Sequence, residues 1–136
     1  MSIQENVQRI RAEMTAAALR CGRDPKQIKL CAATKMNDAD AVRQAIAAGV
    51  DCCGENRVQE LTAKLAENAY EGAPVHFIGH LQTNKVKFVV GKVDLIQSVD
   101  SERLLRAIDK EAAKQKEIRD RSLLQKQRVC YPIIFQ

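Results

Sequence analysis

Strand-like and helix-like segments alternate strictly along the first 116 residues, and this alternation limits the fold more than any other feature. Apolar residues at three- and four-residue spacing predict an amphipathic helix over 3–20, ahead of the alternating segments. The expected strands are 28–34, 50–53, 75–78 and 94–98, and the expected helices follow them from about 38, 58, 84 and 101. Four strand–helix units in series predict a parallel sheet with helices packed outside it and right-handed crossovers.

The ends of the expected strands bring together residues that are far apart in the sequence. Because parallel strands finish at the same edge of a sheet, we expect one rim there. The residues expected on this rim are Lys35, Glu55–Arg57, Gly79–His80 and Ser98–Asp100. They are spread over about sixty positions and would become neighbours.

Lys35 ends the apolar run 28–34, where open α/β sheets and βα-barrels place their ligand sites. An amine is costly to keep charged in an apolar mouth, so we expect its pKa to fall and its nucleophilicity to rise. That chemistry suits a Schiff base with an aldehyde. A strand-end lysine that simply extends to water is the competing interpretation.

Size and composition indicate one ordinary globular domain. The chain has 136 residues, of which 46% are hydrophobic and 29% are charged, and its net charge is +5. Aromatic residues make up 4% and Trp is absent, which argues against a base-stacking platform for nucleic acid. We see no signal peptide and no apolar run of membrane-spanning length, so we expect a cytoplasmic protein that does not bind membranes.

The cysteines and histidines do not predict a metal site. Five cysteines form no C-x-x-C pair, and we expect Cys31 and Cys52 or Cys53 to be small buried hydrophobic residues in reducing surroundings. His76 and His80 are four residues apart, but a strand and a turn between them keep the rings from converging. We therefore predict no metal, a structural role for His76 and a pocket position for His80.

The turn 54–57 has two interpretations. Gly54 could allow close backbone approach to a ligand while Asn56 donates a hydrogen bond to it. Alternatively, Asn56 caps the following helix. The helix start at 82–85 could bind an anion, although this signal is weak, and the chain has neither of the common glycine-rich nucleotide-binding motifs.

Four motifs together resemble a known family in identity, order and spacing. They read ATK at 33–35, GENRVQE at 54–60, HFIGHLQTNK at 76–85 and IQSVDS at 96–101. The family is that of the pyridoxal phosphate homeostasis proteins, also called YggS or PROSC proteins, with the fold of the amino-terminal barrel of alanine racemase. The resemblance covers about residues 1–116.

The resemblance implies a (β/α)8 barrel that binds pyridoxal 5′-phosphate (PLP) in the cell without established catalysis. Lys35 occupies the family's Schiff-base position, and Asn56 and His80 match positions at the barrel mouth. A PLP-dependent racemase or lyase is the alternative from the enzyme class. It needs an acid or base opposite Lys35, and no tyrosine lies near an expected strand end.

The chain departs from the family after about residue 116. The resemblance implies well over two hundred residues, so 1–116 would be the amino-terminal half of a PLP-binding barrel, and the groups that hold the phosphate would lie in the other half. We expect 117–136 to be a divergent tail, out of frame or otherwise unrelated. If the second half is missing, we expect weak PLP binding, and the exposed sheet edges could allow self-association. The chain could also have lost its function, or its basic tail could bind an anionic partner.

Overall fold

The structure is a computed structural model that describes residues 1–121, with side chains described for 1–116. The expectation of a divergent tail therefore falls mostly on residues outside the described part. The helices are α1 (Ile3–Arg20), α2 (Ala39–Ala47), α3 (Val58–Ala66) and α4 (Glu102–Arg121), with 3₁₀ helices η1 (Pro25–Gln27) and η2 (Thr83–Phe88). The strands are β1 (Cys31–Ala33), β2 (Cys52–Glu55), β3 (Val75–Phe77) and β4 (Leu95–Ile96).

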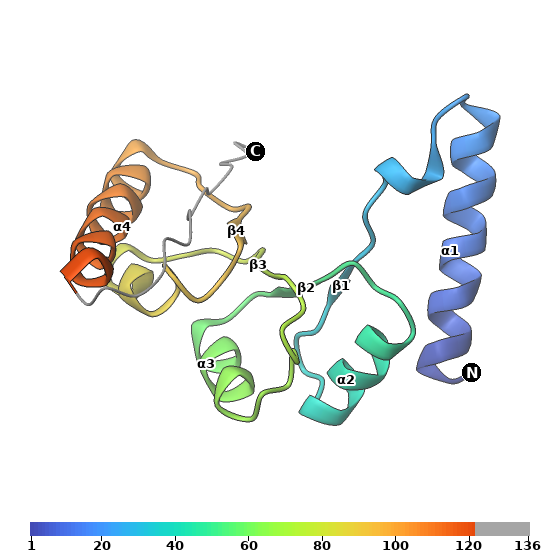
Figure 1. Ribbon diagram of the computed structural model, residues 1–136, viewed down its shortest axis with the longest axis horizontal. Coiled ribbons are helices and arrows are strands. Elements are labelled where there is room, and N and C mark those ends of the chain that lie inside the picture. The colour runs from blue at the N-terminus through green and yellow to red at the C-terminus, as the bar shows by residue number, and fades with distance from the viewer. Residues whose placement is uncertain (122–136) are drawn as a thin grey trace.

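The four strands form one parallel sheet in the order β1-β2-β3-β4, which confirms the predicted α/β architecture. Cys31 pairs with Cys52, Gly54 with His76, and Phe77 with Ile96. Each strand is joined to the next by a helical segment, so every crossover is of the βαβ type. The strands follow an arc with α2, α3 and α4 on its outer side, the arrangement found in part of a βα-barrel (Figure 1).

The hydrophobic core lies between this arc and the helices that follow the strands. Cys53, Phe77 and Ile96 point into it from the sheet, each at most 1% exposed. Leu61, Val86, Leu104 and Ile108 close it from the helical side. Because side chains alternate along a strand, the neighbouring residues of β2 and β3 face the opposite side of the sheet.

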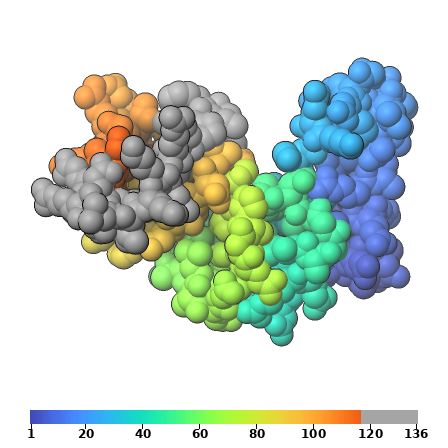
Figure 2. All heavy atoms as spheres, in the orientation of Figure 1, coloured from blue at the N-terminus to red at the C-terminus, as the bar shows by residue number. Residues whose placement is uncertain are grey.

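The amino-terminal helix sits at one end of the arc. It begins with a capping box, in which the Ser2 hydroxyl accepts from the Glu5 N–H and the Glu5 carboxylate accepts from the Ser2 N–H. The helix and η1 form a lobe that joins the rest of the chain along α2 (Figure 2). No helix among residues 1–121 has both the length and the apolar character that a membrane span requires.

Several expected element limits were wrong, each for a local reason. Strand β1 starts at Cys31 because the Ile28 N–H closes η1 and the Leu30 N–H binds the Asp51 side chain. Strand β2 extends to Glu55, whose carbonyl accepts from the Ile78 N–H. The helix expected at 84–90 is instead 3₁₀ over Thr83–Phe88, in a segment rich in β-branched residues that lower α-helix propensity.

One carboxylate ties three elements together at the start of the sheet. Asp51 Oδ2 accepts from Arg11 Nη2 of α1 and from the Leu30 N–H, both at 2.6 Å. Burial alone would raise the pKa of Asp51, but the Leu30 N–H and the Arg11 guanidinium hold that pKa below its ordinary value. This carboxylate therefore stabilises the fold in its ionised form.

We expect Asp51→Asn to destabilise the chain by about 1.5 kcal/mol near neutral pH, since an amide oxygen binds the guanidinium less strongly. The stabilisation is present above the pKa of an unfolded aspartate, about 3.9, and is lost as the pH falls through the lower pKa of the folded state. Urea unfolding of both proteins across this range measures it, with Asp40→Asn, at a side chain 82% exposed, as the control. Equal stability of the two proteins at neutral pH would contradict the prediction.

Candidate functional site

The carboxyl ends of the first three strands lead into the residues expected to bind a ligand. Lys35 follows β1, Asn56 follows β2, and His80 comes three residues after β3. Lys35 is exposed and Asn56 is half-buried, and His80 is exposed. The structure therefore places the three residues after strand ends that share one edge of the sheet (Figure 1).

A strained turn presents Lys35. Met36, directly after it, has φ of 60°, a left-handed conformation that is uncommon for a residue with a Cβ atom. The Asn37 side chain donates to the Lys35 carbonyl at 3.0 Å, and the Asn37 N–H donates to the Thr34 carbonyl at 3.2 Å. The turn fixes the backbone on both sides of the lysine, while the described residues do not form the apolar mouth expected around it.

A buried polar network lies directly beneath this turn. Glu55 Oε1 accepts from Lys64 Nζ at 2.6 Å, from the Thr34 hydroxyl at 2.5 Å and from the Tyr70 hydroxyl at 3.0 Å. Lys64 Nζ also donates to the Thr34 carbonyl at 2.6 Å, next to Lys35 in the chain. The four residues are at most 6% exposed, so the network joins the ends of β1 and β2 to α3 in the buried part of the chain.

Tyr70 serves this network as a hydrogen-bond donor. Burial, together with the charge of Glu55 and its hydrogen bond, raises the pKa of Tyr70 well above its ordinary value. The phenol therefore stays protonated, and its hydroxyl is directed at Glu55. Tyr70 does not lie beside Lys35 as an acid or base, and Tyr131 is outside the described residues.

Asn56 does not cap α3. The residue at the N-cap position is Arg57, whose side chain makes no capping hydrogen bond. The Asn56 Oδ1 atom is buried and has no hydrogen-bond partner, which is uncommon for a polar group in a folded protein. An unpaired amide oxygen next to a strand end is a natural contact for a ligand donor.

Close backbone approach occurs at Gly79 rather than at Gly54. A Cβ atom on Gly79 would lie 2.2 Å from the Asn56 carbonyl oxygen, so only glycine fits there. The space beside Gly54 is filled by the Ile78 and Cys31 side chains, the nearest atom being 2.7 Å from an added Cβ. The expectation that Gly54 makes room for a ligand was therefore wrong.

The two histidines lie apart, as the sequence predicted. His80 Nδ1 lies 3.4 Å from Asp100 Oδ2, and both side chains are more than half exposed, so this pair contributes little stability. His76 lies within β3, where burial lowers its pKa and Gln97 Nε2 lies 2.8 Å from its Nδ1. Only His80 belongs to the rim.

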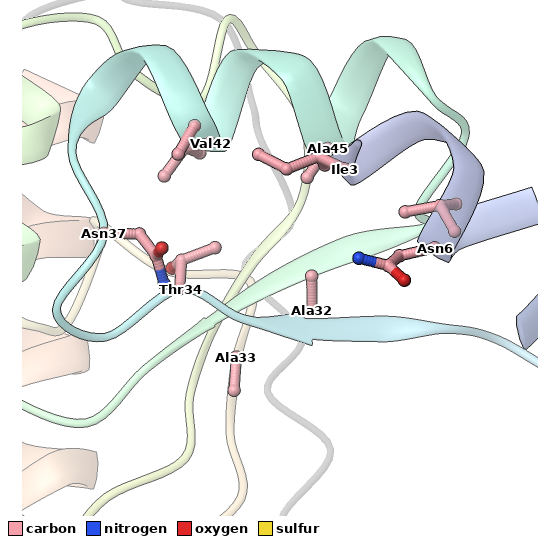
Figure 3. A pocket seen from close by; sticks show the side chains of 10 residues that line it. Ile3, Asn6, Ala32, Ala33, Thr34, Asn37, Val42 and Ala45 are labelled. Atoms are coloured by element: carbon pink, nitrogen blue, oxygen red, sulfur yellow. The ribbon is translucent and has the colours of Figure 1, made fainter. Parts of the chain in front are cut away.

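A cavity of about 190 Å³ lies on another side of β1, between α1 and α2. Around it, Figure 3 shows Ile3 and Asn6 of α1, Ala32 of β1, Thr34 directly after β1, and Val42 of α2. Its lining is mainly apolar and does not include Lys35. Thr34 and Asn37, which flank Lys35 in the chain, also line it, so the cavity borders the turn that presents the lysine.

Sequence reasoning missed the buried network. Lys64 comes three residues after Leu61, so it falls on the apolar face of α3 and not on its exposed face. A lysine on the apolar face of a helix indicates that a carboxylate is buried beside it, and this is how the ion pair could have been predicted. The partner itself, Glu55, was expected on the rim but points into the helical layer.

The fold and the rim together define a class of protein. Parallel βα units with a lysine after the first strand, and polar groups after the next two, are typical of a βα-barrel that binds a ligand at the carboxyl ends of its strands. A scan of protein-family models finds none that matches the chain. Curated relatives and solved structures do match it.

The curated relatives carry one name. The chain is 38% identical over 120 residues to the pyridoxal phosphate homeostasis protein of Aquifex aeolicus, covering 88% of this chain and 53% of that protein. It is 40% identical over 105 residues to that of Escherichia coli, covering 75% and 45%. The resemblance is confirmed: the chain belongs to the pyridoxal phosphate homeostasis protein family and spans about half the length of these relatives.

Solved structures agree. A crystal structure of a protein from Bifidobacterium adolescentis is 38% identical with a TM-score of 0.78, covering 84% of this chain and 51% of that one. PipY of Synechococcus elongatus, solved with PLP bound, is 40% identical with a TM-score of 0.63, covering 78% and 50%. The barrel-type fold expected from the sequence is therefore confirmed for the described part of the chain.

Proposed function

We propose that this chain binds PLP through Lys35 and belongs to a protein that serves intracellular PLP homeostasis. The observation that carries the proposal is an exposed primary amine at the carboxyl end of β1, held by a turn fixed on both sides. The curated relatives' name and the PLP bound to PipY support it.

The residues present fit one end of the cofactor. PLP supplies an aldehyde, and the Lys35 amine would condense with its carbonyl carbon and release one water molecule. Asn56 Oδ1 is unpaired and buried, so it would reach a donor on the ligand only after a side-chain rotation, and His80 would border the same edge of the sheet. The family resemblance implies that the phosphate-binding groups follow the last strands of the full barrel, so we expect this chain to bind PLP weakly.

The described residues fit a protein that binds PLP without catalysis better than they fit an enzyme. A racemase or lyase needs an acid or base facing the reactive carbon, and the Tyr70 hydroxyl is committed to Glu55 in the core. Incubation with L- and D-amino acids in the presence of PLP tests this part of the proposal. We expect no measurable racemisation, whereas turnover that disappears in Lys35→Ala would favour the enzyme.

We expect Lys35 to be the residue that PLP labels. Borohydride adds hydride to the lysine–aldehyde adduct and converts it to a stable secondary amine, which peptide mass mapping locates. Selective labelling at Lys35 that disappears in Lys35→Ala would support the proposal. Lys29→Ala, which removes an exposed lysine six residues earlier, is the matched control and should label like the original chain. Diffuse labelling of surface lysines, unchanged in Lys35→Ala, would overturn it.

A further inference from the structure

Two thiols and an imidazole converge on the face of the sheet that turns away from the helices. The ligand atoms of Cys31, Cys52 and His76 all lie within 4.8 Å of one another. Cys31 is half-buried, Cys52 is 4% exposed and His76 is half-buried. The three residues come from β1, β2 and β3, so three adjacent strands build the cluster.

The strand register explains why residues so far apart in the sequence meet. Cys31 and Cys52 are direct partners across β1 and β2, and His76 is the partner of Gly54, two residues further along β2. Residues two apart on a strand share a face, so all three side chains lie on one side of the sheet. Gly54 has no side chain, and the Cys31 sulfur lies 3.1 Å from where its Cβ would be, in the space between Cys52 and His76.

We propose that Cys31, Cys52 and His76 form a binding site for a thiophilic divalent cation of the Zn²⁺ class. Two cysteine sulfurs and one histidine nitrogen are a common zinc ligand set, with the fourth tetrahedral position left to water or substrate. Zinc bonds of about 2.3 Å to sulfur and 2.0 Å to nitrogen would place the ligand atoms about 3.5–3.8 Å apart. Cys52 Sγ and His76 Nδ1 are 3.8 Å apart, and all three ligand atoms lie within 4.8 Å of one another, so a cation would have to draw them closer by up to about 1 Å.

Gln97 contacts the same imidazole nitrogen. Its Nε2 atom lies 2.8 Å from His76 Nδ1, so the amide would have to turn aside before a cation could bind that nitrogen. Cysteine binds zinc as a thiolate, so binding would release the two thiol protons to the buffer.

This site is separate from the PLP proposal. Cys31 is at the start of β1, and Lys35 comes after its end, about 13 Å further along an extended chain. Because Lys35 is not a ligand of the proposed cation, metal binding can be measured without PLP and in Lys35→Ala. Failure of one proposal would leave the other intact.

Titration of the full, chemically reduced chain with Co²⁺ and then Zn²⁺ tests the inference. We expect one Co²⁺ per chain, a sulfur-to-cobalt charge-transfer band, tetrahedral d–d bands, and loss of all of them when Zn²⁺ is added. Cys31→Ser and Cys52→Ser should each abolish the charge-transfer signal. Gln97→Ala, which removes the amide from His76 Nδ1, should leave Zn²⁺ binding no weaker than in the original chain.

Cys21→Ser is the control, since Cys21 is exposed at the end of α1. It should keep the cobalt spectrum. Circular dichroism of each variant in the absence of metal checks that Cys→Ser leaves the fold intact. Absence of tetrahedral Co²⁺ in the original chain, or a spectrum retained in folded Cys31→Ser and Cys52→Ser, would overturn the site.

Discussion

Replacing Lys64 by alanine should destabilise the chain by about 3–5 kcal/mol, because the Glu55 carboxylate would remain buried without its counter-ion. Glu55 is 0% exposed and Oε1 is shared by three donors, while Oε2 has no partner. Removal of Lys64 would also take one of two donors from the Thr34 carbonyl, which would keep only the Asn37 N–H. Glu55→Ala should cost a similar amount, since it strands the ammonium group instead. Urea unfolding followed by circular dichroism measures both losses.

The double variant Glu55→Leu/Lys64→Met separates loss of charge pairing from loss of packing. Replacing a buried ion pair by apolar side chains of similar volume is often nearly neutral, so we expect the double variant to lose less stability than either single alanine variant. The control is Glu102→Gln, which breaks an exposed pair with Arg106 and should change stability by at most about 0.5 kcal/mol. Single-variant losses as small as that of Glu102→Gln would contradict a buried charge pair.

Replacing Gly79 by alanine should be the second large effect. An added Cβ would lie 2.2 Å from the Asn56 carbonyl oxygen and 2.6 Å from its Cα, so the backbone after β2 and β3 must move apart. The expected destabilisation is about 1–3 kcal/mol, the usual range for forcing a methyl group into a packed site. Because His80 and Asn56 flank this contact, we also expect less borohydride-trapped PLP at Lys35.

Gly72→Ala distinguishes the clash from ordinary glycine strain. Gly72 has φ of +81°, and nothing lies within 4 Å of where its Cβ would be. Its replacement should cost about 1 kcal/mol through left-handed strain alone and should leave PLP labelling unchanged. If Gly79→Ala were no more harmful than Gly72→Ala, the ends of β2 and β3 would have to be further apart than the structure has them.

Helix positions were predictable because their signals are local. Asp38 caps α2 by accepting from the Ala41 N–H, and the Ser101 hydroxyl accepts from the Leu104 N–H at the start of α4, so both caps lie where the helices were expected to begin. The alternation of strand and helix likewise predicted the parallel sheet and its common edge. These features depend on neighbours a few residues away.

The features that the sequence did not reveal depend on register between distant segments. Cys31 and Cys52 have no metal-binding spacing along the chain and meet only because β1 pairs with β2 at that position. Lys35 was expected in an apolar mouth, but the four described strands follow only an arc, so its side chain is exposed. The PLP contacts of Asn56 and His80 remain predictions.

Successive side chains of β2 point to opposite faces of the sheet, and a different contact is made on each face. Glu55 must point toward Lys64, and Cys52 must point toward His76. A slip of β2 by one residue would turn Glu55 away from Lys64 and drive the Cys52 thiol among the helices, leaving an ammonium group alone in the core. Misregistered pairings are therefore penalised on both sides at once, which makes the buried ion pair a device for folding fidelity as well as a source of stability.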